Sequence, residues 1–418
     1  MGSHWTTRCC SAFALIVALT TTGFAQQTTA VDPARSDRRR EAPNAPLGLF
    51  PATEIWDLPL NNLLQAPPAF KNDRGYFPIG EGQIAAYDVR HGTLLWIAPV
   101  GARVEPVLGE NLLYSVEPDA IVALRVDTGV EAWRAALSEP LASPLVCHSG
   151  WLIATAESGT VTAFRAGDGM EMWRQELDAL PHKSGAIGDG RVYVPMADGR
   201  IIALQLETGE RVWEHRVGGS PNDVLATADF VYAGSTDNYF YALRARDGTI
   251  AWRWSTGGDV VGRPVVDNRL VYFVSFDNVL RALDKNTGNQ RWKRGLAFRP
   301  TRGLVVMGTS LIASGLSRSA TAFSMKDGAT VGSMAGAGDE LAAAPHVVTG
   351  EGLPMVVLVS RDLGEGTVVR AVTRQIEPRD QPIAPLPNPV PPPVAPSEPA
   401  TDDQPADTDR ATEDAVRR

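Results

Sequence analysis

Short runs of alternating apolar and polar residues fill the middle of the chain. In the stretch 262–296, apolar side chains alternate with polar ones, and turn-forming pairs such as Asp277-Asn278 interrupt the alternation. Such runs predict β-strands, and the short polar interruptions predict tight antiparallel hairpins. The four strands predicted in this stretch are 262–269, 270–276, 279–284 and 289–296.

This four-strand unit recurs along the chain with a fixed marker. An Ala and a large apolar residue precede a Gly turn, and a Trp stands four residues after the Gly. The marker Gly residues are 37, 40, 40, 39, 40 and 40 residues apart. A period near 40 residues with strand-like content is typical of the blades of a β-propeller. The markers span 86–96, 123–133, 163–173, 203–213, 242–252 and 282–292, and a seventh, 322–332, has Gly332 in place of the Trp.

Each marker residue has a physical role in such a blade. A Gly such as Gly288 suits the hairpin between the third and fourth strands, because a backbone with positive φ penalises residues with a β-carbon. The small Ala lets neighbouring blades approach, and the large Trp fills the wedge that widens away from the ring axis. The Trp residues given this role are Trp56, Trp96, Trp133, Trp173, Trp213, Trp252 and Trp292, whereas Trp151 and Trp254 are either exposed contacts or extra packing.

Two incomplete units at the ends of this region predict how the ring closes. Residues 341–374 contain three strand-like runs without a fourth, and residues 53–58 resemble a fourth strand without the first three. Joining both ends in one blade removes two open sheet edges. The sequence therefore predicts an all-β, eight-bladed β-propeller of four-stranded antiparallel blades over residues 53–374, closed by the N-terminal strand, with seven blades as the alternative.

The marker pattern, in six full copies, resembles the pyrroloquinoline-quinone-type propeller repeat. Within that superfamily, length and layout are similar to BamB, the propeller subunit family of the outer-membrane β-barrel assembly machine. The resemblance implies an exported, non-enzymatic scaffold that binds a protein partner in outer-membrane β-barrel protein assembly. The chain departs from that family in having no recognisable lipidation motif and in its Pro-rich acidic tail.

The larger relatives of this repeat, quinone-dependent alcohol and glucose dehydrogenases, supply an alternative function. As a class they hold the quinone with a vicinal disulfide, a Ca²⁺ site and a catalytic Asp. Here the adjacent pair Cys9-Cys10 lies in the leader, and Cys147 stands alone. We therefore expect no catalytic, cofactor-binding or metal-binding residues. The alternative is a quinone-binding oxidoreductase or small-ligand sensor with its site in the propeller funnel.

Residues just before the first strand of each blade face the funnel at one end of a propeller. Three of these positions hold cations, although the body of the protein is mildly acidic. They could form a basic rim that binds an acidic peptide or small anion. The alternative is that they are ordinary solvated loop charges without a function. The set is Glu105, Ser143, Lys183, Asn222, Arg263 and Arg302, of which all but Ser143 are our predicted partner-binding residues.

The ends of the chain have a different composition. Residues 1–25 hold an apolar stretch and a small-residue ending, which predict a secretory signal peptide, with a retained anchor as the alternative. Residues 26–52 are predicted to be a disordered linker. Residues 375–418 are Pro-rich and then acidic, which predicts a disordered tail that is either solubilising or a peptide ligand.

Charge and motifs narrow the function classes further. The chain has a net charge of −9, and residues 53–374 hold 30 basic and 36 acidic groups, or −6. A nucleic-acid-binding protein is not expected, because its footprint is basic. Metalloprotease, P-loop and nucleophile-elbow motifs are missing, and His residues are scattered singly. We expect a monomer exported to the periplasm that reaches the inner face of the outer membrane through a partner.

Overall fold

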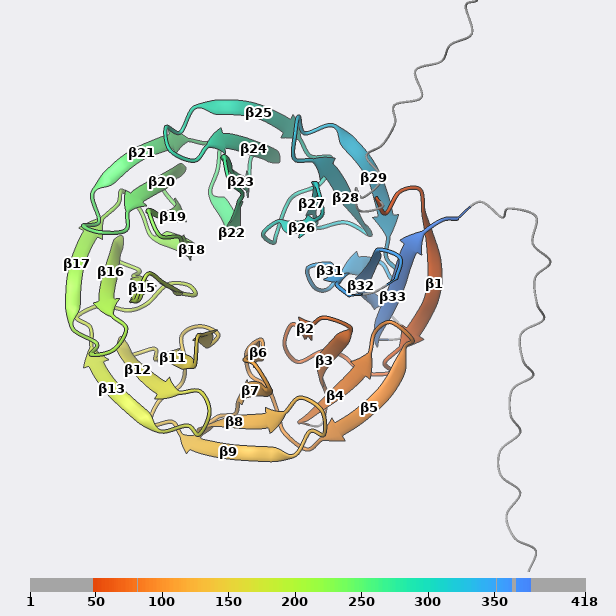
Figure 1. The fold of residues 1–418 in the computed structure, drawn as a ribbon, viewed down its shortest axis with the longest axis horizontal. Helices are drawn as coiled ribbons and strands as arrows, with labels where there is room; N and C mark the ends of the chain where they lie inside the picture. Colours follow the sequence, from red (N-terminus) through yellow and green to blue (C-terminus); the bar gives the residue numbers. More distant parts are fainter. Residues whose placement is uncertain (1–47, 81, 351, 363–365, 377–418) are drawn as a thin grey trace, which may run out of the picture. The chain divides into compact units, whose positions relative to one another are not determined.

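Antiparallel sheets arranged in a ring make up the described part of the protein. The computed structural model describes residues 48–80, 82–350, 352–362 and 366–376, and a compact unit begins at Leu49. Figure 1 shows eight sheets around a central axis. Within these residues all 33 elements are strands, and no helix is long and apolar enough to cross a membrane. The prediction of an all-β, eight-bladed propeller is therefore confirmed.

Blades 1 to 7 are built from four consecutive strands each, ordered from the axis outward (Figure 1). Blade 1 contains β2 (Ala69–Lys71), β3 (Arg74–Ile79), β4 (Gln83–Asp88) and β5 (Thr93–Ala98), and blade 2 contains β6 (Val107–Leu108), β7 (Leu112–Val116), β8 (Ala120–Arg125) and β9 (Glu131–Ala136). Blade 3 contains β10 (Val146–His148), β11 (Trp151–Thr155), β12 (Thr160–Arg165) and β13 (Glu171–Glu176), and blade 4 contains β14 (Ala186–Gly188), β15 (Arg191–Pro195), β16 (Arg200–Gln205) and β17 (Arg211–Arg216).

The second half of the ring repeats this order. Blade 5 contains β18 (Pro221–Ala226), β19 (Phe230–Ser235), β20 (Tyr239–Arg244) and β21 (Ile250–Ser255), and blade 6 contains β22 (Val260–Val266), β23 (Leu270–Ser275), β24 (Val279–Asp284) and β25 (Gln290–Gly295). Blade 7 contains β26 (Val305–Met307), β27 (Ser310–Ala313), β28 (Ser319–Ser324) and β29 (Thr330–Ala335).

The innermost strand of blade 6 ends three residues earlier than predicted. Asp267 accepts hydrogen bonds from the N–H groups of Arg269 and Leu270, both at 2.7 Å, and so starts the turn.

The marker Gly meets two demands at once, as Gly129 shows. Its φ is +71°, and a β-carbon there would lie 2.6 Å from the ring of Trp96, which comes from the preceding blade. The indole N–H of Trp96 also donates to the carbonyl of Val126 at 3.2 Å. At seven of the eight interfaces, one blade is thus fastened to the next through one Trp and one Gly turn. The pairs are Trp56–Gly92, Trp96–Gly129, Trp133–Gly169, Trp173–Gly209, Trp213–Gly248, Trp252–Gly288 and Trp292–Gly328.

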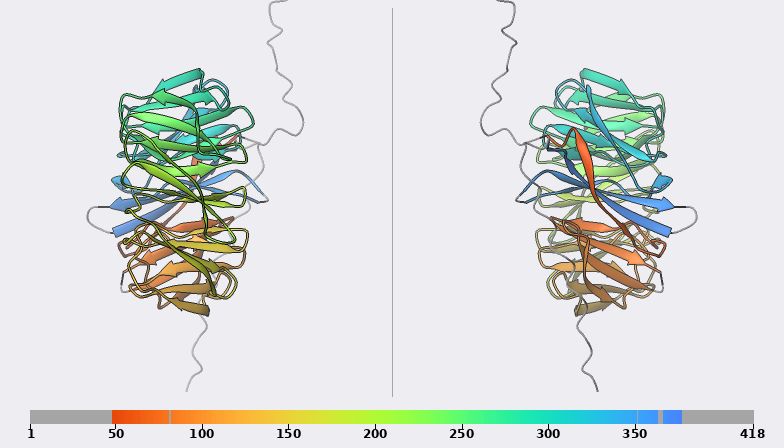
Figure 2. Two further views of the ribbon diagram at one scale, coloured as in Figure 1. Left: turned by 90° about the vertical axis from the view of Figure 1, so that its left-hand side faces the viewer. Right: turned by 90° about the vertical axis from the view of Figure 1, so that its right-hand side faces the viewer.

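Blade 8 is shared between the two ends of the described chain. β30 (Glu340–Leu341) and β31 (His346–Val348) both pair with β32 (Met355–Asp362), which pairs with β33 (Gly366–Arg374). β1 (Ala52–Pro59) completes the blade by pairing antiparallel with β33, Trp56 opposite Ala371. Figure 2 shows β1 running beside β33. The Arg370 guanidinium on β33 donates to both Asp57 oxygens at 2.7 and 2.6 Å. Closure by the N-terminal strand is confirmed.

The seventh repeat, which lacks its Trp, is filled by a residue from outside the repeat. Gly332 pairs with Ala322, as Trp292 pairs with Ala282 one blade earlier. A β-carbon on Gly332 would lie 2.2 Å from Cδ1 of Phe50. The aromatic ring that packs here therefore comes from the segment before β1, and Gly332 leaves room for it.

The hydrophobic core is divided into eight layers, each between neighbouring blades. One layer joins Tyr76 of blade 1 to Leu113 of blade 2, and another joins Val356 of blade 8 to Ile312 of blade 7. The marker Ala residues are fully buried in these layers, for example Ala203. Trp151 and Trp254 are half-buried and pack against two of the layers, which makes extra packing the correct alternative for both.

Candidate functional site

A cavity of about 650 Å³ lies where seven of the eight blades converge. Its walls come from the residues that precede or begin the innermost strands, such as Pro67 of blade 1, Arg302 of blade 7 and His346 of blade 8. Because one lining segment comes from almost every blade, this axial cavity lies on the ring axis. It is the candidate functional site.

Five of the six funnel positions taken from the sequence line this cavity. Glu105, Lys183 and Arg263 are exposed to solvent, and Asn222 and Arg302 are half-buried. Ser143 does not line the cavity: it is 5% exposed, so the expectation that it faces the funnel was wrong. Its blade is the one that contributes no lining residue. Whether the other five bind a partner stays a prediction.

The cavity is balanced in charge rather than basic. The sequence hypothesis counted Lys183, Arg263 and Arg302 against a single acid, Glu105. The structure adds Asp223 and Asp259 to the lining, so three cations face three carboxylates. Asp223 lies one residue after the position that the repeat alignment compares, and Asp259 lies several residues before it. The alignment therefore missed both.

Three of the predicted residues also fasten blades to one another. The amide of Asn222 in blade 5 donates to the carbonyl of Val260 in blade 6 at 2.6 Å. The Arg263 guanidinium donates to the carbonyl of Gly185, two blades back, at 3.2 Å, and that of Arg302 donates to a carbonyl of blade 8. A guanidinium has five N–H donors, so one bond to the wall leaves others for a ligand.

Electrostatics within the cavity couples its charged groups. Desolvation by the surrounding walls raises the pKa of Glu105, and the positive charges of Arg302 and Arg263 oppose that rise. Desolvation likewise lowers the pKa of Arg302, opposed by the charge of Glu105. The two groups therefore stabilise each other in a site where each alone is penalised.

Aromatic rings also line the cavity. The Phe70 ring stacks on His346, with centroids 4.5 Å apart and planes 9° apart, and the His346 Nε2–H donates to the carbonyl of Asn72 at 2.9 Å. Desolvation lowers the pKa of His346, with the Asn72 bond opposing it. Phe276 lies under the Arg299 guanidinium, 4.3 Å from its ring centroid. These rings give the cavity an apolar surface beside its charges.

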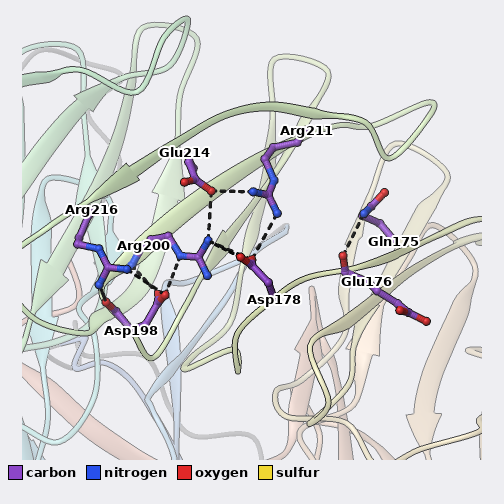
Figure 3. Close-up of polar contacts among 8 residues, drawn as sticks. All are labelled: Gln175, Glu176, Asp178, Asp198, Arg200, Arg211, Glu214 and Arg216. Atoms are coloured by element: carbon purple, nitrogen blue, oxygen red, sulfur yellow. Dashed lines mark hydrogen bonds and ion pairs between the residues drawn. The ribbon is translucent and has the colours of Figure 1, made fainter.

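Figure 3 shows a second polar cluster, centred on Arg200. Arg200 of blade 4, with 10% of its side chain exposed, donates to Asp198 at 2.7 Å and to Asp178 of the preceding crossover at 3.0 Å. Arg211 and Glu214 complete the cluster, 2.8 Å apart. The charges of Arg200, Arg211, Asp178, Asp198 and Glu214 all have opposite partners. Because Asp178 lies in the crossover from blade 3, we assign this cluster to fastening blade 3 to blade 4.

The residues present do not fit a quinone site of the dehydrogenase kind. Among the described residues, no three Asp, Glu, His or Cys side chains are grouped so as to hold a metal ion. Cys147, the free Cys of the described residues, is half-buried, and burial raises its pKa. The pair Cys9-Cys10 lies outside the described residues. No vicinal disulfide or Ca²⁺ ligand set therefore meets the axial cavity in this part of the chain.

The fold and the Trp-marked repeat define a class first: the protein is an eight-bladed propeller of the pyrroloquinoline-quinone-like repeat type. A family model described as outer membrane protein assembly factor BamB matches residues 80–228 and 217–375, more than half of the chain. The chain therefore belongs to the BamB family, and the resemblance drawn from the repeat is confirmed.

Individual relatives are more distant. Outer membrane protein assembly factor BamB of Yersinia pestis is 36% identical over 73 residues, which are 18% of this chain and 19% of that relative. The crystal structure of BamB from Moraxella catarrhalis matches with a TM-score of 0.59 at 19% identity, covering 77% of this chain and 99% of that one. Quinohemoprotein alcohol dehydrogenase from Comamonas testosteroni matches at 0.62 and 12% identity, covering 78% and 77%. Both structural likenesses concern the fold alone.

Proposed function

We propose that the protein is a non-enzymatic periplasmic scaffold in outer-membrane β-barrel protein assembly. The observation that carries this proposal is the BamB family match across residues 80–228 and 217–375. The proposal includes export by residues 1–25, action as a monomer, and contact with the outer membrane through a protein partner rather than nucleic acid. The leader lies outside the described residues.

We further propose that the partner docks at the mouth of the axial cavity. Lys183 and Glu105 are exposed there, and Leu180, three residues before Lys183, is 58% exposed although apolar. An apolar side chain beside charges of both signs is typical of a protein-binding surface. The docked segment then carries charges of both signs, matching the three cations and three carboxylates of the wall.

Site-specific photo-crosslinking in cells tests this proposal. A photoreactive residue replaces Lys183 at the cavity mouth, and in a matched control it replaces Lys293, which is exposed on the outer strand of blade 6. We expect mass spectrometry to find an outer-membrane assembly component joined at position 183 and not at 293. Recovery of such a component at neither position contradicts the function, and equal recovery at both contradicts the docking site.

The oxidoreductase alternative is not favoured by the donor set around the cavity, and it has its own test. Pyrroloquinoline quinone and Ca²⁺ are added to the full chain, and dye reduction and quinone absorbance are followed. We expect no saturable binding and no dye reduction above a buffer control. Saturable quinone binding would overturn the scaffold proposal.

A further inference from the structure

A second groove, of about 840 Å³, lies between blades 6 and 7. Arg269 and Leu270, which line it, stand at the hairpin after β22, whereas the axial cavity is lined by residues at the start of β22. The two sites therefore lie at opposite ends of the innermost strand and on opposite faces of the ring. Cationic side chains gather here: Arg269, Arg291 and Lys326 line the groove, and Lys285 adjoins it through its N–H bond to the Arg269 carbonyl. We call it the basic groove.

The carboxylates near the basic groove are occupied by the protein's own turns. Asp267 accepts hydrogen bonds from two backbone N–H groups and from the hydroxyl of Tyr272 at 2.7 Å. Asp284 pairs with Arg291 at 2.8 Å, and Asp327 accepts from the N–H of Ala329 at 3.0 Å. Within the described residues, no ion pair forms to the cations Arg269, Lys285 and Lys326.

Some other blades place an acid at one of these positions on this face. Arg269 directly precedes the second strand of its blade, where blade 5 has Asp229. Lys326 stands two residues after the third strand of its blade, where blade 2 has Asp127 and blade 4 has Glu207. Blades 1 and 5 hold the cations Arg90 and Arg246 at the position of Lys326. The basic groove is therefore distinguished by the grouping of Arg269, Lys285 and Lys326 in two neighbouring blades, in a body of net charge −6.

The chain leaves the propeller on the face that carries the basic groove. β28, the third strand of blade 7, ends at Ser324, which lines the groove. β33, the third strand of blade 8, ends at Arg374. Because equivalent strands of neighbouring blades end on one face, the described chain ends there too, one blade away from the groove.

The sequence beyond that point complements the groove. Residues 398–414 carry seven acidic residues and one Arg, a net charge of −6. The 22 residues from 376 to 397 are Pro-rich, and a polyproline-like spacer of that length, at ~3.1 Å per residue, would span roughly 68 Å. A β-strand is roughly 20 Å long, so such a spacer easily reaches the next blade. Tethering raises the effective concentration of the acidic segment to the millimolar range.

We propose that the acidic segment 398–414 docks in the basic groove of its own chain. The cations that form no salt bridge among the described residues then receive carboxylates, in addition to the longer-range attraction of Lys285 to Asp267 and of Lys326 to Asp327. Val306 and Met325 offer apolar contact beside them. The tail thereby covers this face and leaves the axial cavity on the other face open. The interaction is electrostatic and weakens as salt shortens the Debye length.

Zero-length carbodiimide crosslinking of the full chain tests the proposal, because it joins carboxylates only to amines in direct contact. The chain has five Lys residues, of which Lys285 and Lys326 belong to the groove, whereas Lys71, Lys183 and Lys293 serve as internal controls. A mixture of light and isotope-labelled protein separates crosslinks within one chain from those between chains. We expect peptides of 398–414 joined to Lys285 and Lys326 of the same chain, several-fold less at 0.5 M salt.

Two variants make the result decisive. Arg269→Glu keeps both reporter lysines and should lower the crosslink yield several-fold. Arg246→Glu, which reverses another exposed cation on blade 5 of the same face, should leave the yield unchanged. Circular dichroism confirms that both are folded. Crosslinks that are absent, spread evenly over the five lysines, formed only between chains, or reduced equally by both variants overturn the proposal.

Discussion

At the scale of a single residue, Asp277 shows how a turn carboxylate fastens one blade to the next. Its Oδ1 accepts from the Ser275 hydroxyl at 2.6 Å, and its Oδ2 accepts from the N–H of Gly257 in the crossover from blade 5 at 3.0 Å. Arg281, 8% exposed, donates to both oxygens. Desolvation opposes ionisation, but the bonds from Arg281, Ser275 and Gly257 outweigh it and lower the pKa of Asp277 to about 2.

This depressed pKa predicts an acid-dependent loss of stability. The unfolded chain binds the proton at an ordinary Asp pKa near 3.8, so the contribution is full above that pH and disappears as pH falls towards 2. After allowance for solvent screening it is about 1–2 kcal/mol. We expect the unfolding free energy of the wild type to fall more between pH 5 and pH 2.5 than that of Asp277→Asn, as measured by urea denaturation.

Asp247→Asn is the matched control for that measurement. The pKa of Asp247 is also about 2, chiefly because of its hydrogen bond from Thr249, but its turn is open to solvent. Because that turn is exposed, solvent screening weakens its contribution, and its replacement should change the pH dependence less than Asp277→Asn does. If Asp277→Asn shows the full wild-type pH dependence, the Asp277 carboxylate does not carry the effect.

At the scale of the element, the sequence predicted strands better than it predicted what packs between them. The shared blade was predictable, because Trp56 keeps the marker spacing at the chain's start and the third-strand run at 367–374 keeps it at the end. Phe50 was not, because it lies outside any periodic run and inside a segment expected to be a linker. Periodicity reports which residues share a strand face, whereas Phe50 reaches Gly332 only through the closed ring.

The Phe50–Gly332 contact predicts a coupled pair of substitutions. Gly332→Ala places a methyl group 2.2 Å from the Phe50 ring and should cost about 1–3 kcal/mol, as overpacking does. Phe50→Ala removes the ring and should cost a similar amount. In the double variant the methyl group has room, so we expect a total loss smaller than the sum by about 0.5–3 kcal/mol.

A double-mutant cycle followed by chemical denaturation measures this coupling. Gly295→Ala is the control, since a β-carbon at Gly295, on the outer strand of blade 6, meets no atom within 4 Å. It should cost little alone and add simply to Phe50→Ala. Additive losses for Gly332→Ala and Phe50→Ala would show that the ring does not stand in for the missing Trp.

At the scale of the whole molecule, the sequence predicted where the candidate site lies, but not its charge balance or its side-chain contacts. The repeat alignment found Glu105, Lys183 and Arg263 because equivalent loops of successive blades converge on the axis. It could not show that Arg263 donates to the Gly185 carbonyl two blades away, because the spacing of repeats along the sequence does not depend on the direction of a long side chain. The two Asp residues that balance the charge were missed for another reason, because Asp223 and Asp259 lie off the position that the repeat alignment compares.

The shared blade also predicts how the ring responds to a change in where the chain begins. Gln375 donates its N–H to the Pro51 carbonyl at 2.7 Å, so a short linker can join 376 to 48. One permutant then opens the chain between Glu207 and Thr208, the turn between the third and fourth strands of blade 4. A second opens it between Val217 and Gly218, in the crossover between blades 4 and 5.

In the first permutant, blade 4 is built from both chain ends, so backbone hydrogen bonds between strands close the ring. In the second permutant every blade is complete, and only side-chain contacts between blades 4 and 5 close the ring. Backbone ladders leave no open edge at the seam. We therefore expect the first to unfold near the temperature of the unpermuted 48–376 chain and the second several degrees lower, with faster hydrogen exchange in blades 4 and 5. Equal unfolding temperatures would mean that packing between blades is enough to hold the ring closed. The place of the N-terminal strand in the last blade would then contribute nothing to stability.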